Sequence, residues 1–228
     1  MNHLLSKIGS YPFEKLNLLH KDIKPSKEVI NLSIGEPKLN ADSRVLDILN
    51  KETNSFSNYP PMNAVPELSE AYRQYLKNHF GIENVAEDEV CLVAGTREGT
   101  FSIIQALFNK ENVKEKPYVV MPNPFYQIYG GATTLAGGEA KFLDCPEEDN
   151  FQPDLDSLKS EDWQKCQILV LCSPNNPTGS VLPLSKLKNI LDLAEKYDII
   201  KKVSTRYETV SYTHLRAHET VLDLVCRL

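Results

Sequence analysis

Two neighbouring amide side chains, Asn175 and Asn176, lie in a short polar stretch that directly follows an apolar run. The run at residues 168–171 is typical of a buried strand, and the Pro, Asn and Gly residues at 173–179 predict a tight turn after it. Ligands of open α/β sheets bind outside the carboxyl ends of the strands. Each amide can donate and accept hydrogen bonds, which suits a flat polar cofactor. The Asn-Pro dipeptide alone is equally consistent with a plain Pro-rich turn.

A second candidate is an anion site at Gly95, Thr96 and Arg97. These residues follow an expected strand at 90–94 and precede an expected helix. Free backbone N–H groups and the helix dipole at such a turn favour a bound anion. A purely structural glycine turn gives the same pattern. Arg97 either faces a substrate or caps the helix that it begins.

These residues need a scaffold, and the hydrophobic pattern predicts alternating strands and helices. The expected strands are residues 29–34, 90–94, 117–121, 140–143 and 168–171, with another beginning at 199. The expected helices are residues 44–51, 66–80 and 183–196, one that follows the turn at 95–96 and includes residues 101–107, and one that begins at about 126. This alternation predicts a mostly parallel α/β sheet, whose right-handed crossovers bring the strand-to-helix loops to one edge.

Composition excludes several classes of protein. The chain has 228 residues, enough for one large domain or two small ones, and a net charge of −6 without a dense basic block, so we expect no nucleic-acid surface. No apolar stretch approaches the roughly 20 residues of a membrane span, and the first residues lack the apolar region of a signal peptide. The 5 cysteines include no C-x-x-C pair. We therefore expect a cytoplasmic chain with reduced thiols and no metal site.

Residues 173–179, Ser-Pro-Asn-Asn-Pro-Thr-Gly, resemble the SPNNPTG signature of the class I/II aminotransferases, which use pyridoxal phosphate (PLP). The Ile-Gly-Glu-Pro string at 34–37 and Tyr-Pro-Pro at 59–61 resemble family motifs in the same order. Residues 95–101, Gly-Thr-Arg-Glu-Gly-Thr-Phe, resemble the GTREALF string of the N-succinyldiaminopimelate aminotransferases of lysine biosynthesis. The likeness covers residues 1 to about 200.

The resemblance implies an α/β fold of the PLP-dependent type I transferase class. Residues 1–30 would form an N-terminal arm, and residues 31–200 part of the large PLP-binding domain with its mostly parallel sheet. The activity implied is transfer of an amino group between an amino acid and a 2-oxo acid. The family also implies a homodimer.

The same resemblance assigns roles to single residues. Gly95, Thr96 and Arg97 would bind the PLP phosphate, with the backbone N–H groups of Thr96 and Arg97 as donors. Tyr126 would stack on the pyridine ring, a task that suits its flat apolar face. Phe125 or Tyr129 could equally be the core aromatic residue of this segment. Asn176 would bind the ring hydroxyl.

Two further positions match family residues nearer the substrate and the dimer interface. Gly35 matches a glycine whose backbone approaches the substrate α-carboxylate, where a side chain would obstruct. Tyr59 matches a tyrosine that reaches the phosphate in the neighbouring subunit.

No catalytic residue can be assigned, because the motifs that react are missing from this sequence. The family's Schiff-base lysine, its pyridinium-binding Asp in an S-D-E-x-Y string and its substrate-binding Arg all come later than residue 199. Lys201 and Lys202 come too early to match that lysine. We therefore expect a transaminase family member whose given chain is inactive.

Residues 201–228 differ in character from the rest. They interrupt the strand expected from residue 199 and resemble the conceptual translation of a sequencing-library adapter, so we expect a non-native tail. His214 and His218, spaced like a metal pair on a helix, receive no role for that reason.

Three alternatives remain open at this point. The chain could belong to another α-amino acid aminotransferase, because the substrate-binding arginines are absent. It could be a non-catalytic PLP-fold module, such as the sensor half of a transcription regulator, although the chain opens on the arm instead of a DNA-binding segment. It could also be a structural α/β domain whose motifs arise by chance.

Overall fold

The computed structural model describes residues 2–30, 40–57, 59, 66–91, 93–111 and 117–204, with side chains described as far as residue 199. The chain divides into two compact units. One contains residues 1–36 and 100–206, and the other contains residues 37–99 and 207–228. Each unit is described by itself below.

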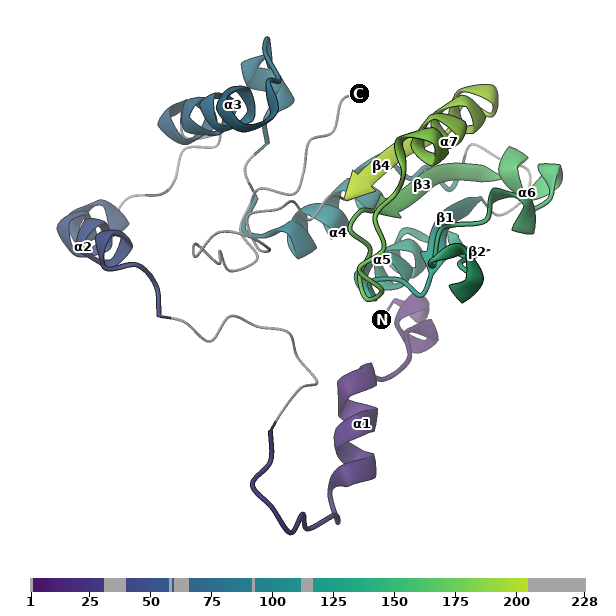
Figure 1. Cartoon of the computed structure of the whole chain (residues 1–228), viewed down its shortest axis with the longest axis horizontal. Helices are drawn as coiled ribbons and strands as arrows, with labels where there is room; N and C mark the ends of the chain where they lie inside the picture. Colours follow the sequence, from purple (N-terminus) through teal and green to yellow (C-terminus); the bar gives the residue numbers. More distant parts are fainter. Residues whose placement is uncertain are drawn as a thin grey trace. The chain divides into compact units, whose positions relative to one another are not determined.

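The first unit contains a parallel sheet of four strands in the order β2-β1-β3-β4 (Figure 1). The strands are β1 (Tyr118–Asn123), β2 (Glu139–Asp144), β3 (Cys166–Cys172) and β4 (Ile200–Ser204). In register, Val119 lies opposite Ala140 on one side and Ile168 on the other. The prediction of an α/β fold with a parallel sheet is therefore confirmed.

The two central strands are apolar and buried in their middle parts, at residues 119–121 and 168–171, because both of their faces are covered there. Alternate side chains of a strand point to opposite faces. On one face, residues of β1 and β3 pack with α4 (Thr96–Leu107) and α5 (Ile128–Ala136); this cluster contains Ile104, Phe108, Val119, Met121, Tyr129, Ala132, Ile168 and Val170.

The opposite face of the sheet packs against α6 (Ser160–Gln164) and α7 (Leu184–Lys196) (Figure 1). Its cluster contains Val120, Leu143, Trp163, Cys166, Leu169, Leu171, Ile190, Ala194 and Ile199. Residues of β1 alternate between the clusters: Val119 and Met121 belong to one, Val120 to the other. The result is a three-layer helix–sheet–helix arrangement that fixes where the strands end.

The remaining elements are short or lie outside this sheet. The first unit also contains η1 (His3–Lys7), α1 (Pro12–His20), η4 (Glu147–Asp149) and η5 (Leu155–Ser157). The second contains α2 (Ser43–Lys51), η2 (Thr53–Ser57), α3 (Pro66–Phe80), η3 (Glu87–Glu89) and the first turn of α4. In the part of the chain that the structure describes, no helix is long and apolar enough to cross a membrane.

Most expected elements are present with shifts of at most two residues. The helix expected at 66–80 is α3, and the helix expected at 183–196 is α7, with Pro183 as its N-cap residue. The helix expected from about 126 begins at Ile128 instead. Residues 29 and 30 are not in a strand, and the rest of that expected strand, at 31–34, lies outside the described residues.

Two expectations about strands are wrong. The described residues of the segment 90–94 form no strand and follow η3 directly, because the apolar pattern there has no neighbouring strand among the described residues to pair with. The interruption expected at Lys201 is also absent: Lys201 and Lys202 lie in β4, opposite Leu169 and Val170 of β3. Among the described strands β4 lies at the sheet edge, where lysines are well tolerated.

Candidate functional site

The carboxyl ends of β1 and β3 form a topological switch point of the sheet. From β1 the chain continues through α5 to β2 on one side, whereas from β3 it continues through α7 to β4 on the other (Figure 1). A crevice at the carboxyl ends of two such strands is the usual ligand position of open α/β sheets. The loop that carries Asn175 and Asn176 begins there, directly after β3.

Internal hydrogen bonds close the loop at residues 173–180 into a fixed shape. The N–H of Asn175 donates to the carbonyl of Ser180 at 2.8 Å, and the N–H of Gly179 donates to the carbonyl of Asn175 at 2.8 Å. The side-chain amide of Asn175 donates to Thr178 Oγ1 at 3.0 Å. Gly179 has a φ of 74°, a conformation that favours glycine. The Asn, Thr and Gly residues of the motif therefore provide the hydrogen bonds and the turn that close the loop.

Asn175 also joins this loop to the loop that follows β1. Its Nδ2 lies 3.5 Å from the carbonyl oxygen of Pro124. The residue is only 8% exposed, and its Oδ1 has no hydrogen-bond partner among the described residues. Asn175 is therefore a structural link between the two loops at the switch point.

Asn176 differs from its neighbour in having a side chain that no described residue engages. It is half-buried, and within the described part of the chain its amide makes no hydrogen bond. Its N–H and C=O groups are therefore available to a ligand. The sequence places both asparagines in one loop, but only their environments distinguish the structural amide from the available one.

The three aromatic residues after β1 have separate environments. Tyr129 is 1% exposed and belongs to the core. Phe125 stacks on Phe142 of β2 with ring centroids 5.2 Å apart. Tyr126 is half-buried and meets Tyr129 edge to face, with centroids 5.8 Å apart. Because Tyr129 fills the core position, Tyr126 is the tyrosine of this segment that retains solvent exposure at the switch point.

A small pocket lies against the base of the loop at residues 173–180, which we call the Asn175 loop. It is lined by Pro122, Phe151, Pro153, Leu171, Cys172, Asn175, Ser180 and Leu182. These residues come from the ends of β1 and β3, from the loop itself and from the connection between β2 and β3. The pocket is small and mostly apolar, so it supports the loop and does not itself accommodate a cofactor.

The predicted anion site lies in the second unit, at the start of α4. Thr96 is the first residue of the helix, so the backbone N–H groups of its first turn lack helical partners, as the sequence predicts. Gly95 has a φ of 128°, and a Cβ there would lie 2.8 Å from Oε2 of Glu98. The Glu98 side chain can move away from this position, so it is the positive φ that favours glycine here. Arg97 is exposed and makes an interaction of its own.

The other predicted residues are less informative. Tyr59 is 98% exposed. Gly35 lies outside the described residues, as do the histidines at 214 and 218. Among the residues that the structure describes, no group of three or more His, Cys, Asp or Glu side chains could hold a metal ion.

The buried thiols do not provide a nucleophile in their present environment. Burial raises the pKa of the Cys166 thiol to about 12, despite hydrogen bonds with the backbone of Val120 and Ile168 that act in the opposite direction. Burial likewise raises the pKa of the Cys145 thiol. Since the reactive form of cysteine is the thiolate, the raised pKa makes each of these two side chains a weaker nucleophile.

Sequence reasoning missed one residue near the loop, Gln152. Its amide Nε2 donates to Ser180 Oγ at 2.5 Å and to the carbonyl oxygen of Val181 at 3.0 Å. The contact joins residues 28 and 29 positions apart in the chain. A single Gln in a polar connection gives no sequence signal of this kind.

Comparison with known proteins establishes the family. The model of the family "Aminotransferase class I and II" matches residues 27–226. The chain therefore belongs to the class I and II aminotransferases, a family whose members depend on PLP. The match also includes most of residues 201–228, and the origin of that segment stays a prediction.

Curated relatives in this family carry two different names. The chain is 28% identical over 212 residues to LL-diaminopimelate aminotransferase 2 from Nostoc sp., covering 91% of this chain and 53% of the relative. It is 29% identical over 199 residues to aspartate aminotransferase from Pyrococcus horikoshii, covering 87% of this chain and 49% of the relative. The chain thus spans about half the length of these relatives.

Solved structures of aminotransferases share the fold. An aminotransferase from Neisseria meningitidis superimposes with a TM-score of 0.82 at 40% identity, over 89% of this chain and 52% of that chain. Aminotransferase AspB from Helicobacter pylori has a TM-score of 0.78 at 34% identity, over 86% and 51%. The likeness again extends over about half of each structure.

The described residues fit PLP, which carries a phosphate, a ring hydroxyl and a flat aromatic ring. At the switch point, Asn176 is half-buried and its side-chain amide makes no hydrogen bond to a described residue. The amide can therefore form a hydrogen bond with a ring hydroxyl. In the second unit, Gly95 has a φ of 128°, which favours glycine, and a helix begins at the next residue. Such a helix start suits a phosphate.

Proposed function

We propose that the complete protein is a PLP-dependent aminotransferase and that this chain contributes part of its cofactor site. The observation that carries the proposal is the available amide of Asn176 at the switch point of the sheet. In its neighbour, Asn175, the amide nitrogen holds the loop. Family membership supports the same conclusion.

Bound PLP supplies an electron sink that stabilises the negative charge developing at the substrate Cα. The residues of this chain would bind and orient it. Asn176 donates a hydrogen bond to the ring hydroxyl oxygen, and Tyr126 offers an aromatic face to the ring. By family resemblance, the turn at residues 95–97 binds the phosphate.

Two further roles rest on family resemblance alone. The backbone at Gly35 leaves room for the substrate α-carboxylate, and Tyr59 reaches the phosphate in a neighbouring subunit. The second role requires a homodimer. We also propose a cytoplasmic location, in agreement with four described cysteines that form no disulfide, Cys91, Cys145, Cys166 and Cys172.

For the substrates we propose an amino acid and a 2-oxo acid, and more specifically N-succinyl-LL-2,6-diaminopimelate with 2-oxoglutarate. The support is the Gly-Thr-Arg-Glu-Gly-Thr-Phe string at residues 95–101. The alternative is another α-amino acid, because the relatives reported above are named for LL-diaminopimelate and aspartate. Assaying a complete protein that contains this chain with these three amino donors distinguishes the alternatives.

The cofactor proposal can be tested on the 228-residue chain. We expect reversible PLP binding in a fluorescence titration, because the family's Schiff-base lysine is not among its residues. Asn176→Ala should weaken binding about tenfold, the effect of losing one hydrogen bond to a charged group. The matched control is Asn189→Ala, on the exposed surface of α7.

Either of two results would contradict this proposal. One is a wild-type chain that shows no saturable PLP binding. The other is equal affinity of the Asn176→Ala and Asn189→Ala variants. Borohydride treatment of the complex adds a check, since a single lysine-linked product at a defined position would overturn the claim that the reacting lysine is missing.

A further inference from the structure

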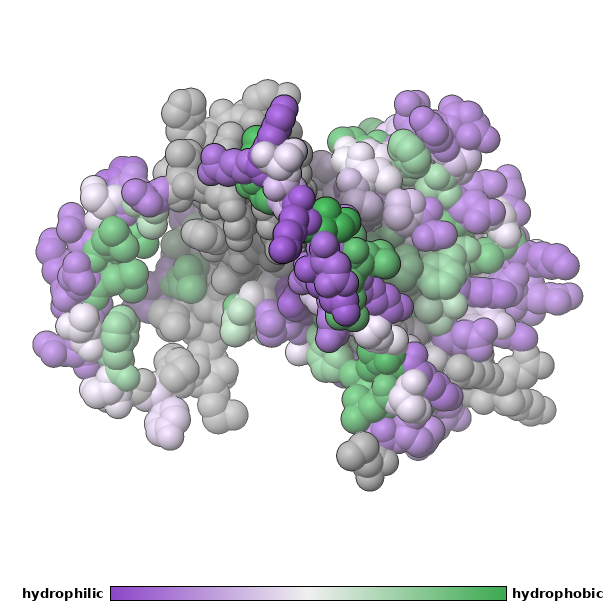
Figure 2. Space-filling model, turned by 90° about the horizontal axis from the view of Figure 1, so that it is seen from below, coloured by the Kyte–Doolittle hydropathy of each residue, from purple (hydrophilic) through white to green (hydrophobic). Residues whose placement is uncertain are grey.

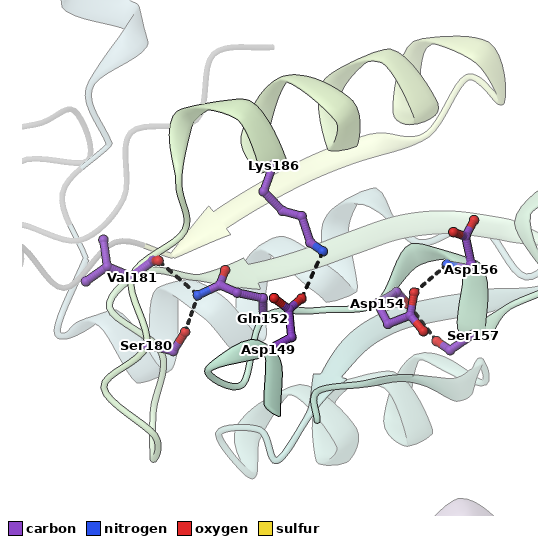
Figure 3. Close-up of polar contacts among 8 residues, drawn as sticks. All are labelled: Asp149, Gln152, Asp154, Asp156, Ser157, Ser180, Val181 and Lys186. Carbon is purple, nitrogen blue, oxygen red and sulfur yellow. Dashed lines mark hydrogen bonds and ion pairs between the residues drawn. The ribbon is translucent and has the colours of Figure 1, made fainter. Parts of the chain in front are cut away.

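The connection between β2 and β3 contacts the Asn175 loop at its second half, through Gln152. Figure 3 shows the Gln152 side chain extended toward Ser180 and Val181, with both hydrogen bonds on its amide nitrogen. Ser180 and Val181 are the residues where the loop leaves the switch point and runs toward α7. The contact therefore holds the last part of the loop, at Ser180 and the following Val181.

The Gln152 end of this contact is buried. Gln152 is 8% exposed, so water competes poorly for its two amide protons. Hydrogen bonds in such a setting stabilise a single arrangement, because breaking them leaves buried donors without partners. The Oε1 of the same amide has no hydrogen-bond partner among the described residues, so the nitrogen is the atom that links the two segments.

The turn that carries Gln152 is itself fixed. The N–H of Gln152 donates to the carbonyl of Asp149 at 3.0 Å, and the N–H of Phe151 donates to that of Pro146 at 2.9 Å. Asp149 also forms an ion pair with Lys186 in the first turn of α7, at 3.4 Å (Figure 3). The turn thus holds both the end of the loop and the start of the helix that follows.

A short series of contacts connects Gln152 to Asn176, whose side-chain amide is the proposed partner of the PLP ring hydroxyl. Gln152 holds Ser180, and the carbonyl of Ser180 accepts the hydrogen bond from the N–H of Asn175 that closes the loop. Asn176 is the next residue. Loss of the Gln152 contact would remove a restraint on Ser180, whose carbonyl closes the loop beside Asn176.

We propose that Gln152 is a positioning residue that fixes the Asn175 loop so that Asn176 is presented to the cofactor. The part of this inference that concerns PLP rests on the function proposed above. The part that concerns the loop does not, because it follows from contacts present in the chain without any ligand.

The first test measures hydrogen exchange of backbone amides in the 228-residue chain. In Gln152→Met, which keeps the length of the side chain but not its donors, the amides of Asn175 and Gly179 should exchange about tenfold faster, as expected for a lost buried hydrogen bond. The matched control is Gln105→Met, whose Nε2 donates to the carbonyl of Ala132 on the opposite face of the sheet at 2.8 Å. That variant should leave both amides unchanged.

A milder variant distinguishes a local effect on the loop from a general loss of folding. Ser180→Ala removes one of the two acceptors and should accelerate the same two amides by a smaller factor, while the fluorescence of the buried Trp163 stays as in the wild type. Unchanged exchange at Asn175 and Gly179 in both Gln152→Met and Ser180→Ala would overturn the proposal. Equal acceleration in Gln105→Met would overturn it too.

The second test is equilibrium PLP binding by the same variants. We expect about tenfold weaker binding for Gln152→Met and no change for Gln105→Met, the loss matching one misplaced hydrogen bond. Combining Gln152→Met with Asn176→Ala should cost no more than Asn176→Ala alone, because Gln152 acts through Asn176. Additive losses would overturn that route. Absent binding by the wild type would overturn the proposed function, whereas the exchange result would still decide the role of Gln152 in the loop.

Discussion

Asn175 and Asn176 are adjacent and chemically identical, yet the structure gives them different tasks. Asn175 is buried and hydrogen-bonded to Thr178 and toward Pro124, whereas the amide of Asn176 has no partner among the described residues. The first holds two loops together, and the second is available to a ligand. Substitution of each residue should therefore affect a different property of the chain.

Asn175→Ala should lower the free energy of unfolding by about 1–2 kcal/mol, because it removes a buried amide that makes two hydrogen bonds. Asn176→Ala should change it by less than about 0.5 kcal/mol, as is usual where no structural contact is lost. Urea unfolding followed by fluorescence of the single Trp163 measures both. Equal destabilisation by the two variants would refute the division of tasks.

Thiol reactivity provides a second residue-scale prediction. Cys91 is exposed, whereas burial raises the pKa of Cys166 to about 12 from an ordinary value of 9.0. At pH 8, iodoacetamide should modify Cys91 rapidly and Cys166 only when the chain unfolds. Peptide mass spectrometry distinguishes the two sites. Rapid modification of Cys166 in the folded chain would contradict the packing of β3.

The same shift predicts a pH dependence of stability. Between pH 9 and pH 12, the unfolded chain loses the Cys166 proton while the folded chain keeps it. Fewer protons bound by the unfolded state mean that the free energy of unfolding falls as pH rises through this window. The contribution is fully present below pH 9. Cys166→Ala should remove this part of the alkaline loss of stability, as measured by urea unfolding at several pH values.

At the scale of elements, the helix α7 combines a buried and an exposed face. Ile190 is fully buried against the sheet, while Leu184 at the start of the helix is 68% exposed. Ile190→Ala should cost about 2–4 kcal/mol, the usual effect of emptying a core position. Leu184→Ala should cost less than about 1 kcal/mol. Urea unfolding monitored by Trp163, which lies in the same cluster, reports the difference.

The elements predicted best from sequence are those whose pattern and neighbours agree. The run at 168–171 is apolar on both faces because β3 lies between β1 and β4 and between two layers of helices. A continuous apolar run with turn residues after it was therefore enough to identify the strand. The segment at 90–94 has the same kind of run but no partner strand among the described residues. Strand formation requires a partner, and a local pattern cannot provide one.

The candidate site was predictable only in part for a related reason. The polar motif at residues 173–179 and the glycine at 95 are local signals, and the structure places each at a strand end or a helix start. The role of Gln152 depends on contacts between segments far apart in the chain. The same is true of the distinction between Asn175 and Asn176, because burial is set by the whole fold.

At the scale of the molecule, the chain spans about half the length of its relatives and exposes apolar surface. The clearest case is α2, whose residues Val45, Leu46, Ile48 and Leu49 are between 48% and 61% exposed. Figure 2 shows these apolar residues as a green area on α2, at the left of the view. Together they form one face of an amphipathic helix, which is typical of a surface that packs against another element.

We therefore expect the 228-residue chain to self-associate at micromolar concentrations and to bind the dye ANS. Replacing two residues of that face, as in Ile48→Glu with Leu49→Lys, adds no net charge and should raise the monomer fraction and lower ANS fluorescence. The matched control is Asn50→Glu with Asp47→Asn on the polar face of α2, which likewise adds no net charge and leaves the apolar face unchanged. Light scattering after size-exclusion chromatography measures the mass of each variant. A monodisperse wild-type monomer without ANS binding would contradict the expectation that the apolar face of α2 is exposed. Equal monomer fractions and equal ANS fluorescence in the two double variants would show that the chain associates through another surface.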